Sequence, residues 1–120
     1  MDRRPTTIFC DIDGTLIKHY PPTVTTKPNC VPELLDGTVE KLLEWDKKGY
    51  NIILVSGRRE ASRKQTEQQL ASLGIIYDKL ILGIGGGKRV LINDMKPYGD
   101  EHYACAINIK RNSGIGNIDI

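Results

Sequence analysis

The sequence predicts a single α/β domain with an open, mostly parallel sheet and flanking helices, in a Rossmann-like arrangement. Three observations support this fold class. Short apolar runs alternate with helical patterns, and several of these runs end in polar residues suited to a binding site. A length of 120 residues provides one domain with a core but not two. We therefore expect residues 1–120 to form one domain with no cap domain over its site.

The first half of the chain contains two expected strands and one helix. Ile8–Ile12 is almost continuously apolar, which predicts a strand buried on both faces. Residues 18–32 carry four prolines and predict a loop, because proline interrupts helices and central strands. Residues 36–49 predict a helix with Asp36 as its N-cap, and Asn51–Val55 predicts the second strand.

The second half is expected to continue the alternation. Residues 59–73 are mostly polar, which predicts a surface helix with a thin apolar stripe. Leu80–Ile84, Val90–Ile92 and Ala104–Ile109 are short apolar runs that predict a third, fourth and fifth strand. The glycine-rich tail that follows allows no assignment.

Composition and charge exclude several classes of protein. The formal net charge is +2, and basic residues are interspersed with acidic ones, so charge alone predicts no binding to nucleic acid. The three cysteines have neither disulfide-framework nor zinc-site spacing, which favours a reducing, cytoplasmic setting. No signal peptide and no apolar run of membrane-spanning length is present, so we expect no membrane association.

Chemistry-bearing residues follow three of the expected strands. Asp11 and Asp13 lie at the end of the first strand, Ser56 and Arg58 follow the second, and Asp94 follows the fourth. Ligands of open parallel sheets bind at the carboxyl ends of the strands, so we expect these side chains to meet at one edge. Two like charges one residue apart require a nearby positive charge. The sequence therefore predicts a site for a hard cation and a phosphate.

Each residue type suits the transfer of a phosphoryl group. Mg²⁺ is usually held by one or two carboxylates and by phosphate oxygens of the substrate, and Asp11 and Asp94 supply carboxylates. A carboxylate can attack phosphorus, and a second one, at Asp13, can protonate the departing oxygen. Gly14 lets the chain turn sharply, and Ser56 can donate a hydrogen bond to phosphate.

Three segments carry a family resemblance. DIDGT at Asp11–Thr15, VSGR at Val55–Arg58 and INDMKP at Ile92–Pro97 resemble motifs I, II and IV of the haloacid dehalogenase superfamily. The chain is most similar to the small capless phosphatases of that superfamily, including those of capsule and sugar biosynthesis. The resemblance implies a HAD-like fold, Mg²⁺ as cofactor and a phosphorylated small molecule, a sugar phosphate, as substrate.

The resemblance also implies a role for individual residues. Asp11 would be the nucleophile and a metal ligand, and Asp13 the acid/base, which also gives its main-chain carbonyl to Mg²⁺. Ser56 would bind phosphate, and Asp94 would be the remaining metal ligand; Asn93 stands before it where the family often has a second acid. The other residues expected to contact substrate are Gly14, Thr15, Gly57 and Arg58.

The family's third motif is a lysine that holds the phosphate and the nucleophile. Lys88 is the first candidate because it follows three glycines, although it lies only six residues before Asp94. Lys64, Lys79 and Arg89 stay open as alternatives for this role.

The sequence argues against two other kinds of phosphate site and leaves two other functions open. Gly85–Lys88 is not a P-loop, because Arg89 stands where serine or threonine is needed. A response-regulator receiver would need an acid after the third strand, where none is found. A phosphotransferase with the same nucleophile and a phosphate-binding module with weak catalysis stay as alternatives. An uncovered site also leads us to expect a homo-oligomer.

Overall fold

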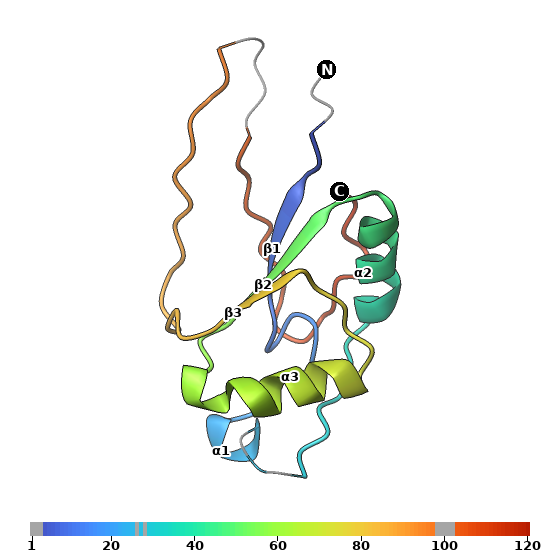
Figure 1. The fold of residues 1–120 in the computed structure, drawn as a ribbon, viewed down its shortest axis with the longest axis vertical. Coiled ribbons are helices and arrows are strands. Elements are labelled where there is room, and N and C mark those ends of the chain that lie inside the picture. The colour runs from blue at the N-terminus through green and yellow to red at the C-terminus, as the bar shows by residue number, and fades with distance from the viewer. Residues whose placement is uncertain (1–3, 26, 28, 98–102) are drawn as a thin grey trace.

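The computed structural model describes residues 4–25, 27, 29–97 and 103–120. Its elements are β1 (Thr7–Asp11), α1 (Pro22–Thr25), α2 (Thr38–Lys47), β2 (Asn51–Val55), the 3₁₀ helix η1 (Glu60–Ser62), α3 (Arg63–Ser72) and β3 (Lys79–Ile81). In the part described, the strands form one parallel sheet in the order β1-β2-β3 (Figure 1). None of the helices described is long and apolar enough to cross a bilayer.

The strand register brings the carboxyl ends of all three strands to one edge of the sheet. Asp11 of β1 lies opposite Val55 of β2, and Val55 lies opposite Ile81 of β3. The residues that follow these three positions leave the sheet on the same side. The expected open parallel α/β sheet is confirmed, and its site-bearing edge is the one where β1 and β2 end.

Only one face of the sheet is buried. Ile8 and Cys10 of β1 and Leu54 of β2 point into a core that also contains Leu42 and Trp45 of α2. The alternate positions are open, with Phe9 of β1 53% exposed. The expectation that this strand is buried on both faces is therefore wrong, because the elements described cover one face and leave the other to solvent.

The helix expected over 36–49 begins later, at Thr38. Its N-cap is Gly37, at φ 76°, and no side chain caps it. Asp36 lies one residue before this cap, and its main-chain carbonyl oxygen accepts hydrogen bonds from the amides of Ile115 (2.9 Å) and Gly116 (3.2 Å). The residue that the local pattern assigned to capping thus contacts a segment almost 80 positions further along the chain.

The remaining boundaries differ from the expected ones by short stretches. The loop over 18–32 contains the single turn α1, and the helix expected over 59–73 begins as η1 before it continues as α3. The third strand ends at Ile81 because Gly83 turns the chain at φ 76° and donates its amide to the carbonyl oxygen of Arg58 (2.7 Å).

The fourth and fifth expected strands, Val90–Ile92 and Ala104–Ile109, are wrong: neither range forms a strand. Residues 84–97, here called the arm, leave the sheet and extend away from it (Figure 1). Val90 is 73% and Ile92 90% exposed, so their apolar side chains meet no core. Strand-forming residues form a strand only when their backbone finds an edge to pair with, and the arm lies away from such an edge.

Residues 109–120, here called the C-terminal segment, pack back on the start of the fold. Ile115 is fully buried in the core. The hydroxyl of Tyr50 and the ammonium of Lys48 both donate to the carbonyl oxygen of Ile120, at 3.2 and 3.1 Å. Gly114 has φ +84°, and a Cβ there would lie 2.5 Å from the carbonyl oxygen of Asp36, so only glycine permits this close approach.

Candidate active site

Asp11 lies at the carboxyl end of β1, and its two carboxylate oxygens make only long contacts with protein groups. Its side chain is 36% exposed. Oδ1 is 3.5 Å from Nη1 of Arg89, and Oδ2 accepts a hydrogen bond of 3.5 Å from the hydroxyl of Thr15. Both contacts are long, so neither oxygen is committed to a strong partner. Asp11 is therefore available to a ligand or a reacting atom.

The surroundings of Asp11 raise its pKa above the ordinary value of an aspartate. Burial is the largest cause, and the charge of Asp13 adds to it. Arg89, the amide of Ile12 and the hydroxyl of Thr15 act in the opposite direction without cancelling the effect. The neighbouring Cys10 is buried, which raises the pKa of its thiol to about 12 and keeps it out of nucleophilic chemistry.

The raised pKa of Asp11 predicts a pH-dependent stability of the metal-free protein. A carboxyl group whose pKa is higher in the folded state stabilises the fold below its unfolded pKa, and this contribution is lost as pH rises through the folded value. We expect Asp11→Asn to gain stability relative to wild type as pH rises from about 4 to about 7. Thermal melts in EDTA would measure this difference. A difference that is constant with pH would contradict the environment described for Asp11.

Asp13 is held by an arginine from the second motif. Nε and Nη2 of Arg58 donate to the two carboxylate oxygens of Asp13 at 3.0 and 2.8 Å. Nη1 donates to the hydroxyl of Thr66 (3.2 Å) and to the side-chain carbonyl of Gln69 (2.7 Å), both on α3. Four hydrogen bonds thus hold the guanidinium, whose side chain is only 10% exposed. Arg58 orients Asp13, and its donors are largely occupied.

Ser56 follows β2 and lies beneath the same edge of the sheet. It is 2% exposed, and its hydroxyl oxygen accepts a hydrogen bond of 3.0 Å from the amide of Arg58. Among the residues described, no acceptor binds the hydroxyl hydrogen. Next to it, a Cβ on Gly57 would lie 2.9 Å from the carbonyl oxygen of Gly85, so glycine lets the loop after β2 approach the base of the arm.

A pocket of about 180 Å³ opens at this edge of the sheet. Its lining residues are Asp11, Asp13, Gly14, Thr15, Ile109 and Arg111. The first four belong to the DIDGT motif, whereas Ile109 and Arg111 belong to the C-terminal segment. Sequence reasoning missed both as pocket residues, because no motif surrounds them: Ile109 was expected only as the end of a fifth strand, and Arg111 follows that run.

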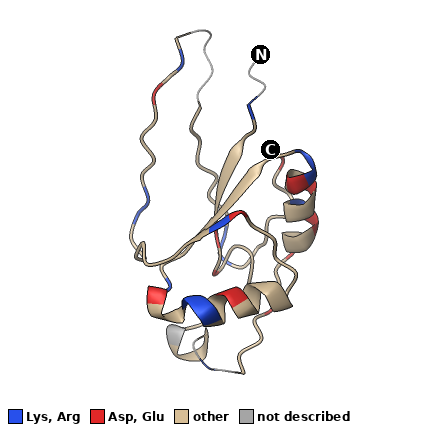
Figure 2. Cartoon of the chain, in the orientation of Figure 1, with Lys and Arg blue, Asp and Glu red and all other residues tan. Residues whose placement is uncertain are grey.

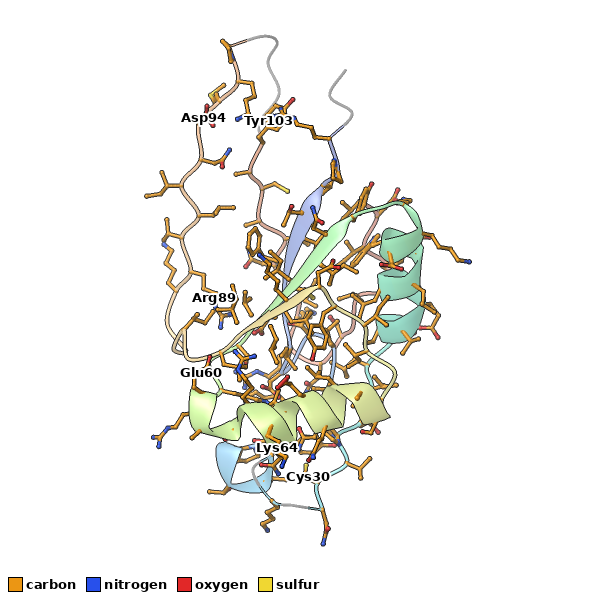
Figure 3. The ribbon with its side chains drawn as sticks, viewed as in Figure 1. Cys30, Glu60, Lys64, Arg89, Asp94 and Tyr103 are labelled. Carbon is orange, nitrogen blue, oxygen red and sulfur yellow. The ribbon has the colours of Figure 1, made fainter. Side chains whose placement is uncertain are left out.

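Asp94 does not join the other predicted metal ligands in this structure. It lies far out on the arm, next to Lys96, with a separation of 3.0 Å between Nζ and Oδ1 (Figure 3). The hydrogen bond from Lys96 lowers the pKa of Asp94. The reason for its position is the missing fourth strand, which was expected to bring Asp94 to the site. Within the residues described, no three His, Cys, Asp or Glu side chains gather to hold a metal ion.

Among the candidates for the phosphate-holding cation, Arg89 approaches the nucleophile. Its Nη1 lies 3.5 Å from Asp11, whereas no ion pair joins Lys88 to either aspartate in the described part of the chain. Lys64 lies on α3, on the far side of the sheet edge from the arm (Figure 3). The structure thus favours Arg89, one residue beyond the first candidate.

Guanidinium groups outnumber carboxylates around the pocket. Asp11, Asp13 and Arg111 line the pocket, and Arg58 and Arg89 form ion pairs with Asp13 and Asp11, which leaves the formal charge of these five side chains positive by one. Elsewhere basic and acidic residues are interspersed, as along α2 and α3 (Figure 2). The local excess at the pocket favours an anionic ligand.

The comparison with known families matches residues 5–82 to the phosphatase domain of polynucleotide kinase, PNKP. This range includes Asp11, Asp13, Ser56 and Arg58, and it ends before the arm. No curated protein sequence matches the chain.

Solved structures support the same relation. Chains in two structures of the Pnkp1/Rnl/Hen1 complex, one described as an RNA repair complex, are 31% and 30% identical over 74% and 80% of this chain, with TM-scores of 0.57 and 0.55. This chain spans only 32% and 28% of their length. A crystal structure of a target from Vibrio cholerae is 17% identical over 73% of this chain and 79% of its own, with a TM-score of 0.54, and shares the fold.

Proposed function

The chain belongs to the polynucleotide kinase phosphatase family of the haloacid dehalogenase superfamily, and on this premise we propose that it is a Mg²⁺-dependent phosphomonoesterase that works through a phosphorylated Asp11. The observation that supports the proposal most is the pocket at the end of β1. There Asp11 and Asp13 share one wall with Gly14 and Thr15, and a positive excess surrounds the two carboxylates.

In the first step, an oxygen of Asp11 attacks the phosphorus of the bound phosphomonoester. The bond between phosphorus and Asp11 forms while the bond to the leaving oxygen breaks, and the leaving oxygen takes a proton from Asp13. Both oxygens of Asp13 accept hydrogen bonds from Arg58, so one must be released before Asp13 can carry the proton. Ser56 has a hydroxyl hydrogen to offer a phosphate oxygen.

In the second step, water hydrolyses the aspartyl phosphate. Asp13 takes a proton from the water as its oxygen attacks phosphorus, and the bond between phosphorus and Asp11 breaks. Inorganic phosphate leaves, and the Asp11 carboxylate is restored. The weak contacts of Asp11 with Arg89 and Thr15 suit this role, because they orient the carboxylate without blocking it.

The donor set of the pocket fits Mg²⁺ in part. Asp11 offers a carboxylate whose oxygens make only long contacts. By the family resemblance, Asp13 would add its main-chain carbonyl. Mg²⁺ is commonly held by one or two carboxylates, waters and phosphate oxygens, so these two residues would hold it together with substrate. When bound, the ion would neutralise part of the negative charge of the phosphate. Asp94 would add a second carboxylate ligand only if the arm placed it at the pocket, which it does not do in this structure.

We propose the phosphorylated end of a polynucleotide as the substrate, with a sugar phosphate second. The family model and the two RNA repair complexes favour the polynucleotide and stand against the expectation, drawn from charge alone, of no nucleic acid. A pocket of about 180 Å³ is below the usual size for drug-sized ligands, so it would take the phosphoryl group and leave a bulky leaving group outside. The homo-oligomer expected from the uncovered site stays a prediction.

A phosphate-release assay tests the proposal. The substrates would be oligonucleotides phosphorylated at either end, a panel of sugar phosphates and p-nitrophenyl phosphate, each with Mg²⁺ or with EDTA. We expect Mg²⁺-dependent release that is fastest from an oligonucleotide end. Release that persists in EDTA would contradict the metal requirement, and a folded protein without any release would favour the phosphate-binding module. Transfer to added alcohols would favour the phosphotransferase.

A further inference from the structure

We infer that Arg111 binds the phosphoryl group of the substrate, as a ligand that the C-terminal segment adds to the site. This inference rests on the proposed function. Arg111 lies outside the range that the family model matches and outside the three motifs of the sequence. It nevertheless lines the same pocket as Asp11 and Asp13.

The stem of Arg111 lies against the loop that carries the nucleophile. Its Cγ is 3.2 Å and its Cδ 4.0 Å from the position that a Cβ on Gly14 would occupy. Gly14, at φ +85°, therefore leaves the space in which the arginine side chain runs toward the pocket. The motif glycine thus serves a second purpose beyond turning the chain, because it admits a side chain from a distant segment.

The backbone around Arg111 is fixed on both sides. Asn112 adopts a left-handed conformation at φ 65°, donates its amide to the carbonyl oxygen of Gly14 (2.8 Å) and accepts the amide of His19 at Oδ1 (2.7 Å). The amide and the hydroxyl of Ser113 both donate to the carbonyl oxygen of Lys110, at 3.1 and 2.7 Å. Arg111 therefore stands on a turn held to the loop after β1, and only its side chain is free to adapt.

Of the three guanidinium groups around the pocket, Arg111 is the one whose donors make no hydrogen bond or ion pair within the described part of the chain. Arg58 is occupied by Asp13 and α3, and Arg89 approaches Asp11. Among the residues described, Arg111 forms no ion pair, although two carboxylates line the same pocket. A guanidinium presents its donors in a planar fork that matches two oxygens of a phosphate. Its ligand would be the non-bridging oxygens of a phosphomonoester.

Binding of inorganic phosphate in the presence of Mg²⁺ tests this role by calorimetry. We expect Arg111→Gln to raise the Kd for phosphate about 10- to 100-fold, the effect of losing charge-assisted hydrogen bonds. Arg111→Lys keeps the charge without the fork and should recover part of the affinity. Lys110→Gln is the matched control, because it removes the adjacent exposed charge, which does not line the pocket, and should change the Kd less than about twofold.

Turnover of p-nitrophenyl phosphate provides the second measurement. We expect Arg111→Gln to raise KM more than it lowers kcat, because the contact already exists in the bound ground state. Equal thermal midpoints of Arg111→Gln and wild type would show that the fold is intact. Wild-type phosphate affinity in Arg111→Gln, or no phosphate binding by wild type, would overturn the inference. Phosphate binding that depends on Arg111 without any hydrolysis would leave the inference standing and refute the proposed function.

Discussion

Replacing Asp11 with asparagine is expected to lower phosphate release at least about 1,000-fold with every substrate that the protein hydrolyses. The reason is that an amide cannot act as the nucleophile that forms the aspartyl phosphate. Phosphate release at saturating substrate and Mg²⁺ would measure this loss. Activity that survives in Asp11→Asn would refute the assigned nucleophile.

The control for this variant is its stability. Burial and the charge of Asp13 disfavour the ionised form of Asp11, so the neutral asparagine is expected to leave the protein as stable as wild type or more stable at neutral pH. Asp46→Asn makes the same chemical change on the exposed side of α2, away from the pocket. It should retain full activity. A melting temperature of Asp11→Asn far below that of wild type would mean that the lost activity reflects unfolding.

Replacing Arg58 with alanine is expected to destabilise the protein by about 3 kcal/mol. The change removes four hydrogen bonds and leaves the Asp13 carboxylate, the Thr66 hydroxyl and the Gln69 carbonyl without their partner. Asp13 is 22% exposed, so water replaces part of what it loses, which limits the effect. Urea unfolding at neutral pH would measure the free energy of unfolding.

Two further variants test whether the hydrogen bonds of Arg58 or its positive charge account for this loss of stability. Arg59→Ala removes the neighbouring arginine, which is exposed, and is expected to change the free energy of unfolding by less than about 0.5 kcal/mol. Arg58→Lys keeps the charge but not the fork that holds both oxygens of Asp13, and should lie between alanine and wild type. Equal stability of Arg58→Ala and Arg59→Ala would show that the four hydrogen bonds contribute little.

The elements that the sequence predicted well are those decided by local patterns. β1, α2 and β2 carry their own apolar periodicity and their own stop signals, so their existence and order followed from neighbouring residues. The same patterns located Asp11, Asp13 and Ser56 at the edge of the sheet, because residues that end parallel strands leave on one side.

The predictions that failed depend on contacts between distant segments. Val90–Ile92 has the composition of a strand, but composition does not specify which edge accepts it, and in this structure the arm pairs with none. Gly37 and not Asp36 stands at the N-cap of α2, and the main-chain carbonyl of Asp36 instead binds the amides of Ile115 and Gly116. Arg111 was not predicted as a pocket residue for the same reason. A turn held by hydrogen bonds to a distant loop places it at the pocket, and no local sequence pattern indicates this.

The turn at Asn112 has a consequence for the order in which the protein is made. His19 and Asn112 are 93 positions apart, yet a hydrogen bond joins them and holds the turn next to Arg111, which lines the pocket. Residues beyond the turn must therefore have left the ribosome before the turn can pack against the loop after β1, and until then the carbonyl groups of Asp36 and Gly14 stay without these partners. The sheet, whose strands lie earlier in the chain, can thus form before this side of the pocket is built.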